Sequence, residues 1–304
     1  MRKKNPTRVL IMGYPYFVNR LRELGRNSEF VLVGLPRNPF RRYFELLRSE
    51  AIYLIGGDLR PNRFFDLALM LGKKVIVHWV GSDILEMREL ANLNRRFSPF
   101  MVRQAEHWSE VEWTAAELAP LGITAKVVPL TPASFPEKVF EMPSKFVALT
   151  YLPQGKEVFY GERELIKIAQ SFPEIVFLAA AASSAEPKPH WPANIIPIGW
   201  VNNMAELYRE VVTLIRLTEH DGLSFMVLEA LSQARYVVWS YPLTGVFQAR
   251  TAATAIPFLT ELYQAFLENK LALNREGREG VERLYRPEIV WEQISQGIRA
   301  VLNR

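Results

Sequence analysis

The chain has 304 residues, of which 49% are hydrophobic and 23% are charged. This length exceeds that of a typical single domain of about 100–200 residues, so we expect two globular domains. The sequence contains no cysteine, which excludes disulfides, thiolate nucleophiles and cysteine-based metal sites. It also lacks a run of about 18 uncharged apolar residues, so we expect no membrane-spanning helix. The four histidines are scattered without metal-ligand spacing, and a cytoplasmic, metal-independent protein is therefore expected.

Positive charge is concentrated in the first half of the chain. Of the 37 Lys and Arg and the 32 Asp and Glu residues, residues 1–140 hold 21 and 14, which leaves 16 and 18 for the remainder. A basic half of this kind suits a phosphorylated substrate, a membrane surface or nucleic acid, or is simply a solvated basic face. Because no basic motif is interleaved with aromatics in the manner of nucleic-acid binders, we expect no nucleic-acid partner.

One basic stretch near the N-terminus also contains aromatic side chains. This pattern is compatible with docking on anionic lipid, and hence with a peripheral position at the inner membrane face. The residues concerned are Arg37, Arg41 and Arg42, beside Phe40, Tyr43 and Phe44.

Short apolar runs alternate with helical patterns throughout the first half, which is typical of βαβ units and parallel sheets. The basic N-terminus is followed by only a short apolar run, which indicates a first strand and not a signal peptide. Segment 131–145 is rich in prolines and has no clean period, so we interpret it as an interdomain linker. We expect strands at 8–13, 30–34, 51–57, 74–81, 106–109 and 125–130, and helices that end at Gly25, Gly72 and Gly122.

The second half repeats the same alternation. Its last helix starts with Pro287, a residue favoured at the first helical position. The whole pattern predicts an α/β protein with two doubly wound domains that face a central cleft, with ligands outside the carboxyl ends of the strands. We expect strands at 145–152, 174–182, 194–199, 211–217 and 236–240, and helices at 163–172, 203–210, 225–233, 258–270 and 287–304.

Polar or flexible residues follow two strands of the first half. Gly13, in "IMGYPYF", permits either close approach of the backbone to a ligand or a tight turn into the next helix. His78 and Asp83, in "HWVGSD", lie where an apolar strand emerges, and a buried strand needs neither. Ser82 or Asp83 is also a candidate N-cap of the next helix. Both segments are candidate ligand contacts.

The stretch "TEHDGLSFMVLEAL" (218–231) follows a strand that carries Arg216 near its end, and Arg216 is a candidate donor-binding residue. We expect Ser224 to be the N-cap of a helix whose first amides, and whose dipole, favour a diphosphate. Glu229, on the second turn, is able to accept hydrogen bonds from both hydroxyls of a ribose-like diol. Its apolar neighbours predict a buried helix, where an acid needs partners; the alternative is a solvated acid.

A further loop, "YLPQGKEVFYGERE" (151–164), follows the first strand of the second half. Lys156 and Arg163 are candidate partners for phosphate, and Gly155 and Gly161 provide backbone freedom. The alternative interpretation is a surface loop with incidental charges.

Taken together, these segments resemble retaining glycosyltransferases of the GT-B fold, especially glycosyltransferase family 4 (glycosyl transferases group 1). "EHDGLSFMVLEAL" is similar to the family's motif of two acids separated by seven residues. The resemblance implies that Glu229 binds the ribose of a nucleotide-sugar and that Asp221 contacts the hydroxyls of its sugar. It also implies that backbone amides of residues 222–224 (Gly222, Leu223 and Ser224) meet the sugar and diphosphate. His78 and Asp83, candidate catalytic residues together with Asp221, would position the donor or the acceptor, and a role as base is the weaker alternative.

The resemblance extends over most of the chain, including "YGERELIKIAQSFPEIVFLAA" and "NIIPIGWVNNMAELY". It implies a Rossmann-like acceptor domain at 1–140, a Rossmann-like donor domain at 141–286, and a closing helix at 287–304 that crosses back to the first domain. The family's basic pair after the first strand of the donor domain does not occur at its usual spacing, and Lys156 and Arg163 are its replacements here. "SQARYVV" also lacks the usual Gly before its strand.

The implied activity is that of a hexosyl or glycosyl transferase. A sugar would move from a nucleotide-diphosphate sugar to a hydroxyl of a saccharide or lipid-linked acceptor, with retention, without metal and without a cofactor. Helix N-termini and basic side chains would stabilise the leaving diphosphate. Two alternatives stay open, namely a non-catalytic nucleotide- or sugar-binding GT-B relative and a GT-B-like nucleotide-sugar epimerase.

Overall fold

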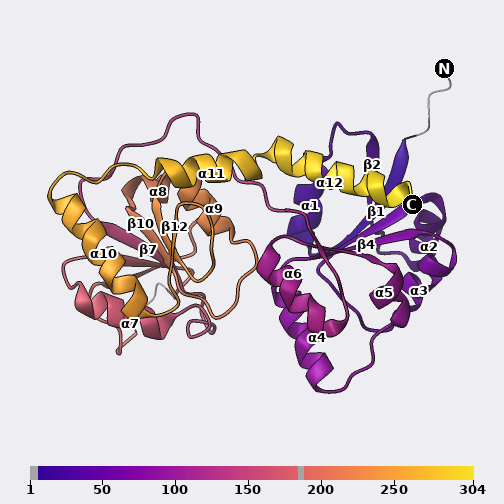
Figure 1. Cartoon of the computed structure of the whole chain (residues 1–304), viewed down its shortest axis with the longest axis horizontal. Helices are drawn as coiled ribbons and strands as arrows, with labels where there is room; N and C mark the ends of the chain where they lie inside the picture. The colour runs from indigo at the N-terminus through magenta and orange to yellow at the C-terminus, as the bar shows by residue number, and fades with distance from the viewer. Residues whose placement is uncertain (1–5, 184–187) are drawn as a thin grey trace. The chain divides into compact units, whose positions relative to one another are not determined.

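The protein is described here by a computed structural model that covers residues 6–183 and 188–304 (Figure 1). It divides into two compact units. Unit 1 comprises Met1–Pro132 and Pro287–Arg304, and unit 2 comprises Ala133–Arg286. The basic residues at the extreme N-terminus, before the predicted first strand, lie outside the described residues. Among the described residues, no helix combines the length and apolar character needed to cross a bilayer.

Unit 1 is built on a parallel sheet, with six strands within the described residues, in the order β2-β1-β3-β4-β5-β6. The registers place Gly13, the last residue of β1, opposite Ile55, the last residue of β3. Each strand overlaps a predicted one, and three of the six are shorter than predicted. The strands are β1 (Thr7–Gly13), β2 (Phe30–Gly34), β3 (Ala51–Ile55), β4 (Lys74–Trp79), β5 (Glu106–Ser109) and β6 (Lys126–Val127).

Helices cover both faces of this sheet. Leu21 of α1 packs with Val290 and Ile294 of α12 on one face, so the C-terminal helix contributes to the core of unit 1. Leu46 of α2 and Met87 of α4 lie in the core on the other face. Helices α2 and α5 were not predicted from the sequence. The helices of unit 1 are α1 (Pro15–Leu24), α2 (Pro39–Arg48), α3 (Arg63–Met70), α4 (Ser82–Asn92), α5 (Pro99–Gln104), α6 (Glu112–Leu118), the 3₁₀ turn η1 (Ala119–Leu121) and α12 (Pro287–Leu302).

Unit 2 also contains a parallel sheet, whose described strands run in the order β12-β11-β10-β7-β8-β9. The strand β12 was not predicted, because it has only three residues. Strand alternation places Ala148, Phe177 and Ile215 in one core with residues of α7 (Glu162–Ser171) and α10 (Ala252–Leu267). The strands are β7 (Val147–Tyr151), β8 (Val176–Ala180), β9 (Ile195–Gly199), β10 (Thr213–Arg216), β11 (Tyr236–Trp239) and β12 (Val246–Gln248).

Five helices within the described residues complete unit 2. Helix α10 starts earlier than predicted, at a capping box formed by Thr251 and Thr254, and it continues through Pro257. Where the family's usual Gly is absent, Ala234 adopts the left-handed φ of 54° itself. The helices are α7 (Glu162–Ser171), α8 (Met204–Glu210), α9 (Phe225–Ser232), α10 (Ala252–Leu267) and α11 (Arg275–Tyr285); α11 was not predicted.

The proline-rich segment 131–145 forms neither helix nor strand. Its later part is held by the buried side chain of Arg235. The Arg235 guanidinium donates from Nε to the Tyr208 carbonyl oxygen at 2.7 Å and from Nη2 to the Glu141 carbonyl oxygen at 3.1 Å. Because a buried guanidinium without partners would be costly, these bonds fix the segment to unit 2.

Candidate functional site

Each sheet has one point where the order of its strands reverses, and open parallel sheets bind ligands outside the carboxyl ends of the strands at such a point. In unit 2 the reversal lies between β7 and β10, which are paired through Ile215 and Thr150. In unit 1 it lies between β1 and β3. The predicted site residues follow strands at these two carboxyl edges, and each edge is described by itself.

At the carboxyl end of β10, Arg216 and Asp221 form a bidentate ion pair. The Arg216 Nε donates to Asp221 Oδ2 at 2.5 Å, and Nη2 donates to Oδ1 at 3.1 Å. Their side chains are only 8% and 14% exposed. Burial alone would lower the pKa of Arg216, but the charge and hydrogen bonds of Asp221 outweigh it and raise that pKa. The two residues were predicted as separate ligand contacts, whereas the structure joins them into one charged unit.

Aromatic side chains surround this pair, and the sequence analysis did not identify them. The Trp239 indole donates to Asp221 Oδ2 at 3.2 Å. The Arg216 guanidinium lies 5.6 Å from the ring centroid of Tyr151 and 5.1 Å from that of Tyr160. These aromatic faces and the ion pair hold each other in place. Tyr151 is the last residue of β7, and this position at the strand end was the signal that could have identified it.

The motif continues from Asp221 into α9. Ser224 is the N-cap of this helix, as predicted, and Gly222 and Leu223 are buried beside it. The helix itself is buried, as its apolar neighbours predicted, whereas Glu229 is partly exposed on its second turn. The pKa of Tyr208 is raised mainly by burial and, to a smaller extent, by the negative charge of Glu229. Glu229 is therefore close enough to Tyr208 to affect its pKa, and it is partly exposed.

A cavity of about 210 Å³ opens beside the motif. It brings the predicted Arg163 together with Thr218 and Glu219 of the motif, and it adds Arg250, which the sequence analysis did not single out. Lys156 is exposed on the preceding loop and does not line this cavity. The lining residues are Val158, Gly161, Arg163, Glu164, Leu217, Thr218, Glu219 and Arg250.

The wall of this cavity depends on one glycine. Gly161 has a φ of +86°, and a Cβ there would lie 2.2 Å from the carbonyl oxygen of Leu217. Only glycine allows this close approach, which brings the loop before α7 against the end of β10. The loops are also tied together because the Thr218 hydroxyl and the Glu219 amide both donate to the Phe159 carbonyl oxygen, at 3.2 and 2.9 Å.

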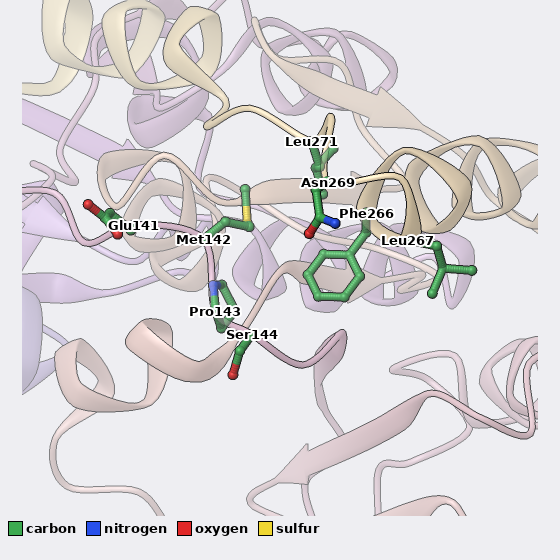
Figure 2. A pocket seen from close by; sticks show the side chains of 8 residues that line it. All are labelled: Glu141, Met142, Pro143, Ser144, Phe266, Leu267, Asn269 and Leu271. Atoms are coloured by element: carbon green, nitrogen blue, oxygen red, sulfur yellow. The ribbon is translucent and has the colours of Figure 1, made fainter.

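A larger, open cavity of about 510 Å³ lies elsewhere in unit 2. Figure 2 shows the segment Glu141–Ser144 on one side of it and the stretch from Phe266 to Leu271 on the other. Because residues 141–144 precede β7, this cavity lies towards the amino edge of the sheet and away from the motif. Its position does not match the edge at which parallel sheets bind ligands.

In unit 1, Gly13 ends β1 with a φ of +125°. A Cβ at this position would lie 1.8 Å from the carbonyl oxygen of Ile55, so the close packing of β1 against β3 requires glycine. Residue 13 is exposed, as are the neighbours Tyr14 and Pro15. The structure therefore explains Gly13 by the turn, and its predicted contact with a ligand stays a prediction.

His78 and Asp83 are buried side chains with partners inside unit 1. The His78 Nε2 lies 2.8 Å from the Val128 carbonyl oxygen, and Nδ1 lies 2.6 Å from the Tyr53 hydroxyl. Because a carbonyl only accepts, Nε2 carries the proton and Nδ1 accepts from Tyr53. Burial lowers the pKa of His78 to about 3, which keeps this ring neutral at pH 7.

The Asp83 carboxylate joins the ends of two strands. It accepts from the Gly57 amide at 2.5 Å, from the Gly81 amide at 2.8 Å and from the amides of Val80 and Ile84. Burial raises the pKa of Asp83, although these four amides act in the opposite direction. Neither Ser82 nor Asp83 is the N-cap of α4, because Gly81 occupies that position. The ligand role predicted for Asp83 stays a prediction beside this evident structural role.

Glu110 is an acid at this edge that the sequence analysis missed. It follows β5 directly and is only 3% exposed. The Thr131 hydroxyl donates to its Oε1 at 2.6 Å. Burial raises the pKa of Glu110 to about 8, and the nearby charge of Asp83 contributes in the same direction. An acid directly after the predicted strand 106–109 was the signal that could have identified it.

Comparison with solved structures identifies the fold. The chain is similar to a glycosyltransferase from Rickettsia africae ESF-5 (TM-score 0.71, 10% identity, 98% of this chain and 99% of that chain covered). It is also similar to the sucrose-phosphate synthase of Thermosynechococcus elongatus (TM-score 0.67, 12% identity, 98% and 99% covered). The same holds for Anabaena HepE in complex with UDP and glucose (TM-score 0.63, 8% identity, 97% and 99% covered).

These three matches span nearly the whole chain and confirm the predicted α/β architecture with two Rossmann-like domains, the GT-B fold. At the level of sequence, no protein-family model matches the chain, and no curated protein matches it.

Proposed function

We propose that this protein is a glycosyltransferase that moves a sugar from a nucleoside-diphosphate sugar to an acceptor hydroxyl, with unit 2 as the donor-binding unit. One observation carries the proposal. At the reversal point of the sheet in unit 2, the two-acid motif, the N-terminus of α9 and a cavity with two arginines lie together. A nucleotide-sugar offers the matching groups: a diol, a diphosphate and a polyhydroxylated ring. The complex of the similar HepE with UDP and glucose supports this assignment by analogy.

Each part of the site has a proposed task. The partly exposed Glu229 accepts hydrogen bonds from the two ribose hydroxyls, because an ionised carboxylate only accepts. The first amides of α9 face the diphosphate at the positive end of the helix dipole. Arg163 and Arg250 supply positive charge from the wall of the cavity. Arg216 is not assigned to the diphosphate, because its guanidinium is already paired with Asp221.

The proposed reaction proceeds with retention and without a metal. Arginines and helix amides stabilise the leaving diphosphate as charge develops on it. The acceptor hydroxyl attacks the same face of the sugar, and the departing phosphate takes its proton. Asp221, fixed by Arg216 and Trp239, orients hydroxyls of the donor sugar. The acceptor is proposed to be a saccharide or a lipid-linked hydroxyl.

The proposal is tested first by binding. Titration calorimetry with nucleoside diphosphates and nucleotide-sugars should reveal one site per chain, and turnover assays should detect donor hydrolysis or transfer. Absence of binding at millimolar concentration would refute both the transferase and the epimerase assignments. Binding without any turnover would favour the non-catalytic relative, and release of an epimerised free sugar would favour the epimerase. Proton NMR of the product linkage decides between retention and inversion.

The ribose assignment has a sharper test. Glu229→Ala should weaken nucleotide affinity by about 1–3 kcal/mol, through loss of charge-assisted hydrogen bonds. Glu206→Ala is the matched control, because this acid lies in the same unit with an exposed side chain on α8. Equal affinity of both folded variants and the unaltered protein would exclude the ribose role of Glu229.

A further inference from the structure

Helix α2 has an apolar stripe that faces away from the core of unit 1. Its inner side contributes Leu46, which is 1% exposed. Four large apolar residues follow the spacing i, i+3, i+4 and i+7, which places them on one face of the helix. Phe40, Tyr43, Phe44 and Leu47 are 85%, 44%, 54% and 61% exposed. A helix that only covered the sheet would have no need for this second stripe.

The neighbouring helix α3 extends the same surface. The rings of Tyr43 and Phe64 are in contact, with their centroids 5.8 Å apart. The Lys73 ammonium donates to the Leu47 carbonyl oxygen at 2.9 Å. These contacts place α2 and α3 side by side, and exposed residues of both form what we call the α2–α3 patch: Phe40, Tyr43, Phe44, Leu47, Leu67, Met70 and Leu71. Apolar surfaces of this extent mark interaction sites.

Arginines predominate in α2 and in the residues that lead into it. The acids of the two helices are engaged elsewhere, since Glu45 pairs with Arg8 at 2.5 Å and Asp66 accepts from the Ser98 hydroxyl at 2.8 Å. In contrast, within residues 6–183 and 188–304 no carboxylate pairs with the arginines of α2 and its approach, which are Arg37, Arg41, Arg42 and Arg48. The patch therefore combines protruding apolar side chains with unneutralised guanidinium groups.

We propose that the α2–α3 patch docks unit 1 on the surface of an anionic lipid bilayer. The aromatic and aliphatic side chains enter the interface between headgroups and acyl chains, and the arginines bind lipid phosphates. A second copy of this chain is a poorer occupant, because it would bring arginines against arginines and like charges repel. The proposal is independent of the proposed transfer reaction, because it uses none of the residues of the donor site.

Vesicle flotation tests the proposal directly. The full chain is mixed with vesicles of phosphatidylcholine, or of equal parts phosphatidylcholine and phosphatidylglycerol. We expect flotation with the anionic vesicles and none with the neutral ones. Binding should weaken as salt is raised, because ions screen charges beyond a Debye length of about 10 Å at 0.1 M.

Two double variants separate the charges from the apolar stripe. Arg41→Gln/Arg48→Gln should lower the partition coefficient on anionic vesicles by about 25-fold, since each basic residue near such a surface contributes about fivefold. Phe40→Ser/Leu47→Ser should lower it by about tenfold or more through loss of apolar area. Both pairs are exposed, so thermal unfolding should stay unchanged.

Matched controls carry changes of the same kinds at residues outside the patch. Arg26→Gln/Lys126→Gln removes two exposed charges after α1 and on the edge strand β6, and Leu93→Ser/Leu284→Ser removes two exposed leucines. These controls should bind like the unaltered protein. The proposal is overturned if the protein ignores anionic vesicles at low salt, or if controls and patch variants bind alike. Sedimentation in which Phe40→Ser/Leu47→Ser abolishes a dimer, without any vesicle binding, would assign the patch to a second copy instead.

Discussion

The carboxyl edges of the two sheets differ in their polar residues: those of unit 1 are buried and paired inside the protein, whereas unit 2 adds exposed ones to its buried Arg216–Asp221 pair. In unit 1, His78, Asp83 and Glu110 are at most 3% exposed, and protein groups occupy their hydrogen-bonding atoms. In unit 2, Arg163 is exposed, Glu229 is partly exposed, and both belong to loops or helix turns beyond the strand ends. Polar residues after parallel strands thus have two different uses. Position after a strand does not by itself separate these two uses, and the exposure of the side chain is needed as a second criterion.

The largest expected effect tests the structural role of Asp83 in unit 1. Asp83→Ala leaves the amides of Gly57, Val80, Gly81 and Ile84 without their acceptor. It should lower the free energy of unfolding of unit 1 by about 3–5 kcal/mol, because buried unpaired donors are costly. Urea denaturation measures this effect. Glu86→Ala, at a half-exposed position of α4, should stay within about 0.5 kcal/mol. A stable Asp83→Ala variant that only loses ligand binding would reverse our interpretation.

The Arg216–Asp221 pair should behave as one unit. Arg216→Met leaves the Asp221 carboxylate with the Trp239 indole and without its counter-charge, at 14% exposure. The free energy of unfolding should fall by about 2–3 kcal/mol, somewhat less than for a fully buried pair. Combining Arg216→Met with Asp221→Asn should cost less than the sum of the single changes, as a double-mutant cycle by urea denaturation would measure. Strict additivity would show that the pair contributes no coupling.

Glu110 predicts a pH dependence. Its folded pKa of about 8 lies above the ordinary value of 4.5, so between these values the folded state holds a proton that the unfolded state has released. Stability should therefore fall as pH rises through this window, by at most about 1.4 kcal/mol per pH unit. Glu110→Gln removes the titration, so its stability relative to the unaltered protein should rise from pH 5 to pH 8. A constant difference across this range would contradict the raised pKa.

The smallest expected effect tests Arg163 as a proposed contact of the nucleotide-sugar. Arg163→Gln should weaken nucleotide-sugar affinity about five- to tenfold, through loss of a charged contact that solvent partly screens. Its stability should stay unchanged, because the side chain is exposed. Arg275→Gln, also exposed in unit 2, is the control for net charge, and calorimetry measures both. If the variant loses stability but keeps its affinity for the nucleotide-sugar, Arg163 has a structural role and does not bind the ligand.

The sequence predicted most strands because parallel strands buried on both faces appear as short apolar runs. It predicted α9 and its N-cap because Gly and Ser precede a continuous apolar stretch. Helix α2 was not predicted from its apolar residues. Its inner face contributes one buried residue, Leu46, while its larger apolar stripe points outward, so the usual relation between apolar spacing and the core fails there. Helix α10 was predicted too short because Pro257 resembles a helix break.

The pairing inside the site was harder to predict than its location. The motif identified Asp221, and its position at a strand end identified Arg216, but the conformation of the four residues between them decides that the two side chains meet. The indole of Trp239 and the ring of Tyr160 come from other elements, and only the sheet order brings them to Arg216. Ala234 illustrates the same limit. The missing glycine was noted in the sequence, yet the backbone keeps the left-handed conformation that a glycine would favour.

Helix α12 has a consequence for biosynthesis. Four of its residues, Val290, Ile294, Ile298 and Val301, belong to the core of unit 1, whose remaining residues lie before position 133. A ribosome therefore delivers all of unit 2, which is continuous in sequence, before unit 1 has its full core. Unit 2 should therefore be able to fold while unit 1 still lacks α12. An isolated fragment of residues 1–132 should aggregate unless a chaperone binds it.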